Sequence, residues 1–269
     1  MDGNLNILED LSIKLMPNIT YMLLGENGCG KSTLIKTILN IIPPKHGKIY
    51  LNRNLSSKKS KLIGYCPQHD IIIDYLTVKE HLYFYWRIKT NVDPTNEETT
   101  INKLIETMGL THLKDSYVKN LSGGQKRKLS ICIAFIGNPF LVILDEPTSG
   151  VDPESRRSIY ELISNNKEGK TILITTHHME ETEILGDEFI MMASGKLLDT
   201  GTLLELKKKY GSTSKLIIEM SDMERNKKTV IDYVYLNCDC VLAHTIRNAD
   251  IIFELKISYK FDKSMSKLF

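Results

Sequence analysis

Short continuous runs of apolar residues mark the expected strands of this chain. Residues 140–144 read FLVIL and residues 171–175 read TILIT, with few polar positions. Strands of a parallel sheet are covered on both faces, so they show such runs and not a strict alternation of apolar and polar positions. TYMLLGENGCGKSTLIKTIL predicts another strand, a glycine-rich turn and a helix that begins near residues 30–32. KLIGYCPQHD predicts a further short strand that ends near Gln68.

From Leu76 onward the apolar residues recur at helical spacing. LTVKEHLYFYWRIK predicts a helix with Thr77 as its N-cap. A polar connection over 91–100 follows, and INKLIETMGL predicts a second helix. Residues 69–138 are therefore predicted to be a helical insertion between two halves of a parallel sheet.

The remaining pattern predicts a hairpin and a small separate unit. EFIMMASGKLLDTG is typical of a hairpin that turns at Ser194-Gly195. Strand-like and helical stretches over 214–259 predict a small α+β unit. The predicted division is therefore a core of residues 1–68 and 139–213, a helical subdomain of 69–138, and a small C-terminal α+β region of 214–269.

Composition limits the class of protein. The chain has 269 residues, 42% of them hydrophobic and 25% charged, which is ordinary for a folded domain. A net charge of +2 gives no reason to expect nucleic acid as a partner. The longest apolar run, residues 131–144, contains Gly, Asn and Pro and is too short to cross a bilayer. The five cysteines form no zinc-type spacing, so free thiols are expected.

A phosphate-binding loop is the strongest chemical motif. Residues 25–32 read GENGCGKS, which matches G-x-x-x-x-G-K-[ST] between a predicted strand and a predicted helix. Its glycines allow backbone N–H groups to surround an anion at a helix N-terminus, Lys31 would reach the outer phosphates, and the Ser32 hydroxyl would ligate Mg²⁺. The alternative is a glycine-rich turn that binds nothing. The residues expected to bind the nucleotide are Gly25, Asn27, Gly28, Cys29, Gly30, Lys31, Ser32 and Thr33.

Two carboxylates follow the FLVIL strand directly. Ligands bind beyond the carboxyl ends of the strands in open parallel sheets, so Asp145 and Glu146 are expected to face the phosphates. Asp145 would hold Mg²⁺, and Glu146 would polarise the attacking water as a general base. The alternative is a solvated Asp-Glu turn, which the five preceding apolar residues make a poor fit.

The segment LSGGQ, residues 121–125, lies between these two motifs and completes an ordered set. Together they make residues 5–210 resemble the nucleotide-binding domain of an ATP-binding-cassette (ABC) protein. That resemblance implies an α/β fold: a P-loop NTPase core with a mainly parallel sheet, an inserted helical subdomain and a small C-terminal α+β extension. It also implies ATP and Mg²⁺ as cofactors and ATP hydrolysis as the activity.

Further site roles come from the resemblance by position. It implies that Gln68 senses Mg²⁺ and water, and that His177 contacts the γ-phosphate while His178 is a bystander. It implies that the signature segment binds the γ-phosphate held by a second cassette, so that two cassettes close head to tail, with Asp152 in the loop by which they sense each other. The signature residues concerned are Ser122, Gly123, Gly124 and Gln125.

Three basic residues follow the signature segment. Lys126, Arg127 and Lys128 lie in a first helical turn, where the helix macrodipole slightly disfavours positive charge. An incoming phosphate would relieve this cost. A solvated basic face is the alternative for each of the three.

The similarity extends to one subfamily. EPTSGVDPESRR, TTHHMEETEILGDEFIMMASGKLLDTGT and LLELKKKYGSTSKLIIEM resemble subfamily A of the ABC transporters, whose better-known members move lipids. This implies a second cassette, from the same or a different chain, and transmembrane domains as partners, and a place on the cytoplasmic face of a membrane. It also implies a regulatory role for 214–269. The aromatic stripe of residues 83–86 is expected to pack within the helical subdomain, or to receive a cytoplasmic helix of the transmembrane partner.

The chain departs from the family pattern in two ways. Residues 1–10 contain no aromatic residue to stack on adenine. The chain also has one cassette and no membrane span, whereas subfamily A members carry membrane spans and usually two cassettes in one chain. We expect an excised domain or a partial gene product. Two alternatives to a transporter motor stay open: a soluble ABC ATPase that acts on a non-membrane complex, and a regulatory cassette that binds ATP with little turnover.

Overall fold

The computed structural model describes most of the chain. The described residues are 7–51, 63–90, 97–210, 213–219, 223–238, 241–247 and 250–256. Parts of three predictions lie outside these residues: the start of the aromatic-free segment 1–10, most of the polar connection 91–100, and the end of the C-terminal region, 257–269. Cys240 also lies outside them.

The chain divides into two compact units, residues 1–203 and residues 204–269. The first unit contains a six-stranded sheet with the order β2-β3-β4-β1-β5-β6. The first five strands are parallel, and β6 runs antiparallel to β5 after a turn at Ser194-Gly195, as the sequence predicts. The strands are β1 (Thr20–Gly25), β2 (Ile63–Cys66), β3 (Leu141–Asp145), β4 (Thr171–Thr175), β5 (Glu188–Ala193) and β6 (Lys196–Gly201).

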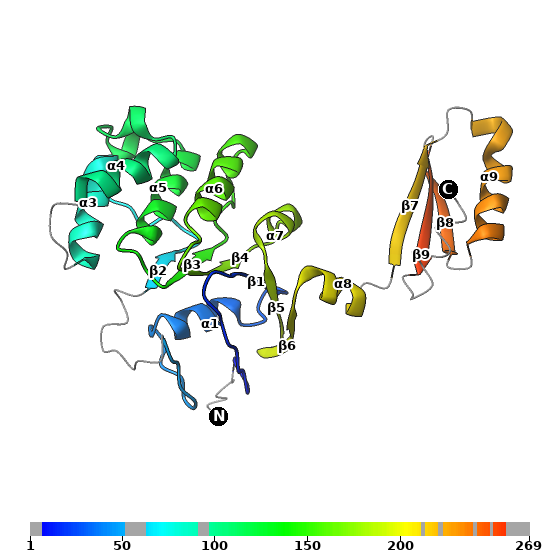
Figure 1. Cartoon of the computed structure of the whole chain (residues 1–269), viewed down its shortest axis with the longest axis horizontal. Helices are drawn as coiled ribbons and strands as arrows, with labels where there is room; N and C mark the ends of the chain where they lie inside the picture. Colours follow the sequence, from blue (N-terminus) through cyan, green and yellow to red (C-terminus); the bar gives the residue numbers. More distant parts are fainter. Residues whose placement is uncertain are drawn as a thin grey trace, which may run out of the picture. The chain divides into compact units, whose positions relative to one another are not determined.

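Helices cover both faces of this sheet, which explains the continuous apolar strands (Figure 1). On one face, Leu34 and Ile35 of α1 (Lys31–Ile38) pack with Leu141 and Ile143 of β3. α5 (Gly123–Phe135) lies on the opposite face, together with α6 (Pro153–Asn165) and α7 (Met179–Leu185). The predicted P-loop NTPase architecture is therefore confirmed.

The insertion between β2 and β3 is helical. Its helices and short 3₁₀ turns are α3 (Val78–Lys89), α4 (Glu97–Thr107), η2 (Thr111–Leu113), η3 (Val118–Asn120) and α5. Thr77 caps α3: its hydroxyl accepts a hydrogen bond from Glu80 N, and the Glu80 side chain accepts one from Thr77 N. In the aromatic stripe Trp86 is buried, whereas Phe84 is 45% exposed, so one part of this stripe packs internally and another faces outward.

A glycine sets the distance between α5 and β2. A Cβ atom on Gly64 would lie 1.8 Å from the backbone oxygen of Ala134, which is a severe overlap. Gly64 is therefore required by close backbone approach, because any side chain at this position would force α5 away from the strand.

The second unit begins within α8 (Leu203–Tyr210) and contains a small sheet. Strands β7 (Thr213–Glu219), β8 (Val241–Arg247) and β9 (Asp250–Lys256) form an antiparallel sheet of order β7-β9-β8, and α9 (Met223–Asn237) connects β7 to β8. Its core joins the helix and the sheet through Val234, Cys238, Ile251, Phe253 and Leu255. This is the α+β extension expected from the sequence.

Two sequence predictions can be compared with the described part of the chain. No helix there has the length and apolar character needed to cross a bilayer. Four cysteines are buried free thiols, namely Cys29, Cys66, Cys132 and Cys238.

Lys89 gives the fold a testable pH dependence. Its Nζ donates to Ile133 O at 2.8 Å, and burial lowers its pKa to about 8. In the unfolded chain a lysine titrates near 10.4, so the unfolded state binds more protons between these two values and stability rises with pH across that window. We predict that Lys89→Met raises the free energy of unfolding by about 2 kcal/mol at pH 7 and by less at pH 9.5.

Urea denaturation at both pH values measures this difference. Ile133 O still accepts from Ile136 N in the variant, so the substitution leaves no orphaned carbonyl. Lys103→Met, on an exposed position of α4, is the matched control and should show no such pH dependence. A stabilisation by Lys89→Met that stays constant or grows with pH would contradict the prediction.

Candidate functional site

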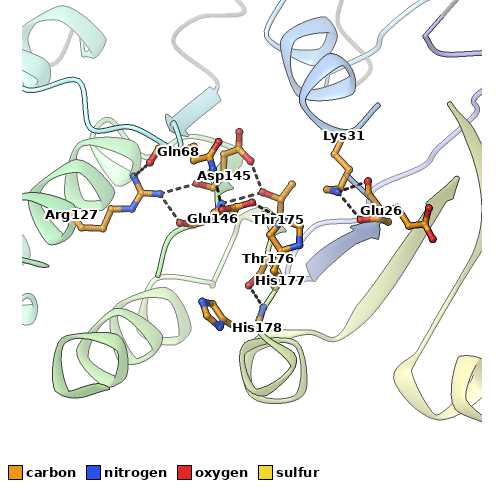
Figure 2. A network of polar contacts seen from close by, with 11 residues as sticks. Glu26, Lys31, Gln68, Arg127, Asp145, Glu146, Thr175, Thr176, His177 and His178 are labelled. Atoms are coloured by element: carbon orange, nitrogen blue, oxygen red, sulfur yellow. Dashed lines mark hydrogen bonds and ion pairs between the residues drawn. The ribbon is translucent and has the colours of Figure 1, made fainter. Parts of the chain in front are cut away.

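Four segments meet at one edge of the sheet because β3, β4 and β1 are neighbours. The glycine-rich loop follows β1, Asp145 and Glu146 end and follow β3, and His177 follows β4. Gln68 comes after β2, the neighbour of β3 on the other side. Figure 2 shows Lys31 on one side of this edge and Glu146 on the other, with Thr175 between them.

The loop between β1 and α1 has the backbone that an anion site requires. Gly28 has φ 80° and Gly30 has φ 107°, in a region that side chains with a Cβ rarely adopt. Gly30 is the N-cap of α1 and has no side chain that could accept a hydrogen bond. The first N–H groups of the helix are therefore not capped by a side chain at this position. Lys31 Nζ donates to Gly25 O at 2.6 Å and Glu26 O at 3.0 Å, which holds the ammonium over the loop.

The other predicted residues of this loop differ in exposure. Asn27 and Ser32 are exposed, and Thr33 is half-buried. Cys29 is 5% exposed and packs in the core, while its backbone oxygen accepts from Gly195 N at 2.9 Å. Cys29 therefore contributes its backbone to the loop, and its thiol belongs to the core.

Asp145 and Glu146 are fixed by the neighbouring strand end. Thr175 Oγ1 donates to Asp145 Oδ1 at 2.5 Å and accepts from Glu146 N at 3.1 Å. Glu146 has φ 49°, a left-handed backbone conformation that costs a residue with a Cβ about 1–3 kcal/mol. Such strain persists only where the surroundings hold it, and it is concentrated at functional sites.

The Glu146 carboxylate lies between two predicted site residues. Gln68 Nε2 donates to Glu146 Oε2 at 3.1 Å, and His177 Nε2 lies 2.8 Å from Glu146 Oε1. The ring of His178 lies apart from this group, and its backbone N–H donates to Thr176 Oγ1 at 3.0 Å (Figure 2). The structure thus brings Gln68, Glu146 and His177 into direct contact.

The oxygen atoms at this edge of the sheet are suitable ligands for a hard cation, although only one of them comes from a carboxylate. A hydroxyl from Ser32, an amide oxygen from Gln68 and a carboxylate from Asp145 are oxygen ligands of the kind Mg²⁺ takes when phosphates and water complete its shell. Within the described residues no cluster of three His, Cys, Asp or Glu side chains gathers as a metal cage. The residues present therefore fit Mg²⁺ held jointly with a nucleotide, and do not form a site that would hold a metal by itself.

The signature segment begins α5, away from the loop at α1. Ser122 caps the helix in a reciprocal pair with Gln125, at 2.9 and 3.3 Å. A Cβ on Gly124 would lie 3.2 Å from Asp152 Oδ2, so the signature segment and the start of α6 are neighbours. In the described part of the chain no hydrogen bond or ion pair joins the signature segment to the glycine-rich loop.

Asp152 itself has a defined local role. It caps α6 by accepting from Ser155 N at 2.9 Å, and the hydrogen bonds from the Ser155 backbone and side chain lower the pKa of its carboxyl group. Asp152 is therefore a stable anion at the exposed start of this helix.

Arg127 requires a correction. The prediction for the three basic residues was a phosphate contact or a solvated face, but Arg127 is 3% exposed and its guanidinium is hydrogen-bonded inside the protein. Helical spacing does not reveal this burial, because every residue from Leu129 to Phe135 is buried and the helix has no single apolar face.

Glu181 also lies near the candidate site, and no motif in the sequence indicates its position there. It is buried in the first turn of α7, Thr148 Oγ1 donates to its Oε2 at 3.3 Å, and burial raises the pKa of its carboxyl group. It links the loop after Glu146 to the segment that carries His177. Thr175 has no distinguishing sequence signal either, because threonine is common in strands and this one simply ends the run TILIT.

Comparisons with known proteins agree with this geometry. The family model described as "ABC transporter" matches residues 8–149. ATP-binding cassette sub-family A member 2 of Rattus norvegicus is 43% identical over 215 residues, which cover 78% of this chain and 9% of the relative. Phospholipid-transporting ATPase ABCA3 of the same species is 36% identical over 268 residues, 97% of this chain and 16% of the relative.

A solved structure shares the fold and the family name. The structure described as the ATP binding subunit of an ABC transporter superposes with a TM-score of 0.71 at 28% identity, over 78% of this chain and 89% of that one. The chain spans about a tenth to a sixth of the length of these two curated relatives. The matched family model, together with relatives from one subfamily, shows that this chain belongs to the ABC transporter family and is most similar to its subfamily A.

Proposed function

We propose that this chain is an ATP-binding and ATP-hydrolysing cassette domain that closes on Mg-ATP as a head-to-tail pair and powers transmembrane transport, with lipid as the cargo. The observation that carries the proposal is the Glu146 carboxylate held between Gln68 and His177 at the sheet edge that also carries the glycine-rich loop. A general base, its positioning partners and a phosphate cradle are the parts that hydrolysis of a nucleotide requires.

ATP would bind by its phosphates. The loop of residues 25–30 presents backbone N–H groups at the start of α1, where the helix dipole favours negative charge. Lys31 now donates to two backbone oxygens of its own loop, Gly25 O and Glu26 O. Its ammonium has three N–H donors, so it would turn towards the β- and γ-phosphates when ATP binds. Asn27, Cys29 and Thr33 would add backbone or side-chain contacts.

Mg²⁺ would be held by Ser32, Gln68 and Asp145 together with phosphate oxygens. When bound, it would offset the negative charge that develops on the transferred phosphoryl group. The chain's own residues would do the rest. Glu146 would orient and polarise the attacking water, and His177 would contact the γ-phosphate while fixing the carboxylate through its 2.8 Å contact.

A second cassette would complete each site. The signature residues Ser122, Gly123 and Gly124 lie at the start of a helix, where Ser122 and Gly123 are exposed and Gly124 is half-buried, as expected for a group that meets a phosphate from another molecule. Asp152 is exposed beside Gly124, so the two would lie in one pairing surface, with Gln125 fixing the Ser122 backbone. This agrees with the finding that, among the residues the structure describes, no hydrogen bond or ion pair joins the signature segment to the loop.

Transport, its lipid cargo and a place at the cytoplasmic face rest on the relatives. One of them is described as a phospholipid-transporting ATPase, and this chain spans a small part of its length, which leaves room for transmembrane domains in the rest. A surface groove of about 760 Å³ at α3, lined by Tyr83, Phe84, Ile88 and Asp115 among others, supports a contact with those domains. Its mixture of apolar and charged groups suits a cytoplasmic helix of the transporter.

The first prediction concerns pairing. Glu146→Gln should slow ATP hydrolysis by about 10²–10⁴-fold because it removes the general base, while the cradle still binds ATP. The variant should therefore shift to a dimer on size exclusion in the presence of Mg-ATP, and Glu146→Gln combined with Lys31→Ala should not.

ATP binding is measured on the same samples by calorimetry. A variant that binds Mg-ATP but stays a monomer would contradict pairing between two copies and would point to a different cassette as partner. A wild-type chain that binds no ATP would overturn the proposed function as a whole.

The second prediction separates two adjacent histidines. His177→Ala should lower the turnover number of the paired cassettes by about 10²-fold or more, because the ring contacts Glu146 directly. His178→Ala is the matched control and should change turnover by less than about threefold, because its ring lies apart from the carboxylate. Equal losses in the two variants would contradict the assignment of His177.

A further inference from the structure

Arg127 joins two loops of the site from the helical insertion. The side chain comes from the first turns of α5 and is 3% exposed. Figure 2 shows its guanidinium between the Gln68 segment and the turn at Glu146. Its acceptors are Pro147 O at 2.9 Å from Nε, Pro67 O at 2.5 Å, Asp70 Oδ1 at 2.9 Å and Gln68 O at 3.3 Å from Nη1, and Asp145 O at 2.8 Å and Glu146 O at 2.9 Å from Nη2.

Three of these acceptors are consecutive carbonyls. The backbone oxygens of Asp145, Glu146 and Pro147 all point at one cation, which requires a sharp turn at the residue in the middle. That residue, Glu146, has φ 49°. A planar guanidinium with donors in a fixed fork can hold such a turn, because it donates to all three of these carbonyls at once.

The same guanidinium also holds the Gln68 backbone. Pro67 O and Gln68 O accept from Nη1, so the backbones that carry the Gln68 and Glu146 side chains share one anchor. Those two side chains then meet at 3.1 Å. The relative position of amide and carboxylate is therefore set by a residue that touches neither side-chain group.

A purely structural ion pair is the competing explanation. Asp70 lies 2.9 Å from Nη1 and would by itself offset the cost of burying the charge. It is one of six acceptors that share the five N–H groups of the guanidinium. The other five acceptors are backbone oxygens of the two segments that carry Gln68, Asp145 and Glu146.

We infer that Arg127 is a positioning residue for ATP hydrolysis: it holds the Gln68 segment and the Glu146 turn in one arrangement, so that amide, metal-binding carboxylate and general base face the same point. This inference rests on the proposed roles of Gln68, Asp145 and Glu146. Arg127 acts through them and does not contact the nucleotide.

Arg127→Lys tests the inference, since lysine keeps the charge and loses the fork. The apparent affinity for Mg²⁺, titrated calorimetrically against the chain with ATP, should weaken by about 10- to 100-fold. ATP affinity in EDTA should stay within about twofold, because the cradle of residues 25–32 is untouched. The turnover number should fall by about 10²-fold with KM for ATP nearly unchanged.

Arg157→Lys is the matched control. Arg157 is exposed on α6, and the same chemical change there should leave the magnesium affinity and the turnover as in the wild type. Should Arg127→Lys fail to fold, as judged by its thermal unfolding curve, Arg127→Gln carries amide donors without a buried charge and takes its place in the same measurements.

A double-mutant cycle with Gln68→Ala distinguishes positioning from general damage. If Arg127 acts through Gln68 as well as Asp145, the loss of magnesium affinity in Arg127→Lys/Gln68→Ala should be smaller than the product of the two single losses. Two losses that multiply in full, or equal losses of ATP affinity with and without magnesium, would indicate a structural role only and overturn the inference.

Failure of the inference is distinct from failure of the proposed function. The proposed function, and this inference with it, would be overturned by a wild-type chain that binds no Mg-ATP. The same holds if the Lys31→Ala variant binds Mg-ATP as tightly as the wild type. A wild-type chain that binds Mg-ATP, beside an Arg127→Lys variant that keeps both magnesium affinity and turnover, would overturn the inference alone.

Discussion

The neighbour order of β3, β4 and β1 is the constraint on which the site depends. Residues after Gly25, Leu144 and Thr175 are far apart in the chain, yet the parallel register of these strands puts their carboxyl ends at one edge. The central strand also acts chemically. Its last residue, Thr175, donates to Asp145 Oδ1 and accepts from Glu146 N, so the strand that separates the loop from the carboxylates also fixes the carboxylates.

The site combines an unstrained glycine loop with a strained turn. Glycines with positive φ form the loop without strain, because they have no Cβ. Glu146 takes a similar backbone conformation at a cost, and contacts from the end of β4, from Gln68 after β2 and from α5 hold it there. This backbone strain directs the Glu146 side chain out of the sheet edge, to a position between the Gln68 amide and the His177 ring.

Much of the fold follows from local patterns in the sequence. The strands were predictable from FLVIL and TILIT, the start of α3 from Thr77 and Glu80, and the hairpin from Ser194-Gly195. The strand order was not predictable from these patterns, because a run of apolar residues does not reveal which strand lies beside it. The burial of Arg127 and Glu181 was missed since each is compensated by long-range partners that no local pattern contains.

The close approach at Gly64 has a mechanical consequence for the helical insertion. With Ala134 backbone against the strand and no side chain between them, α5 and β2 have no layer of flexible atoms over which to slide. Any movement of α5 would therefore carry β2 with it, and with β2 the Gln68 segment, which follows this strand directly.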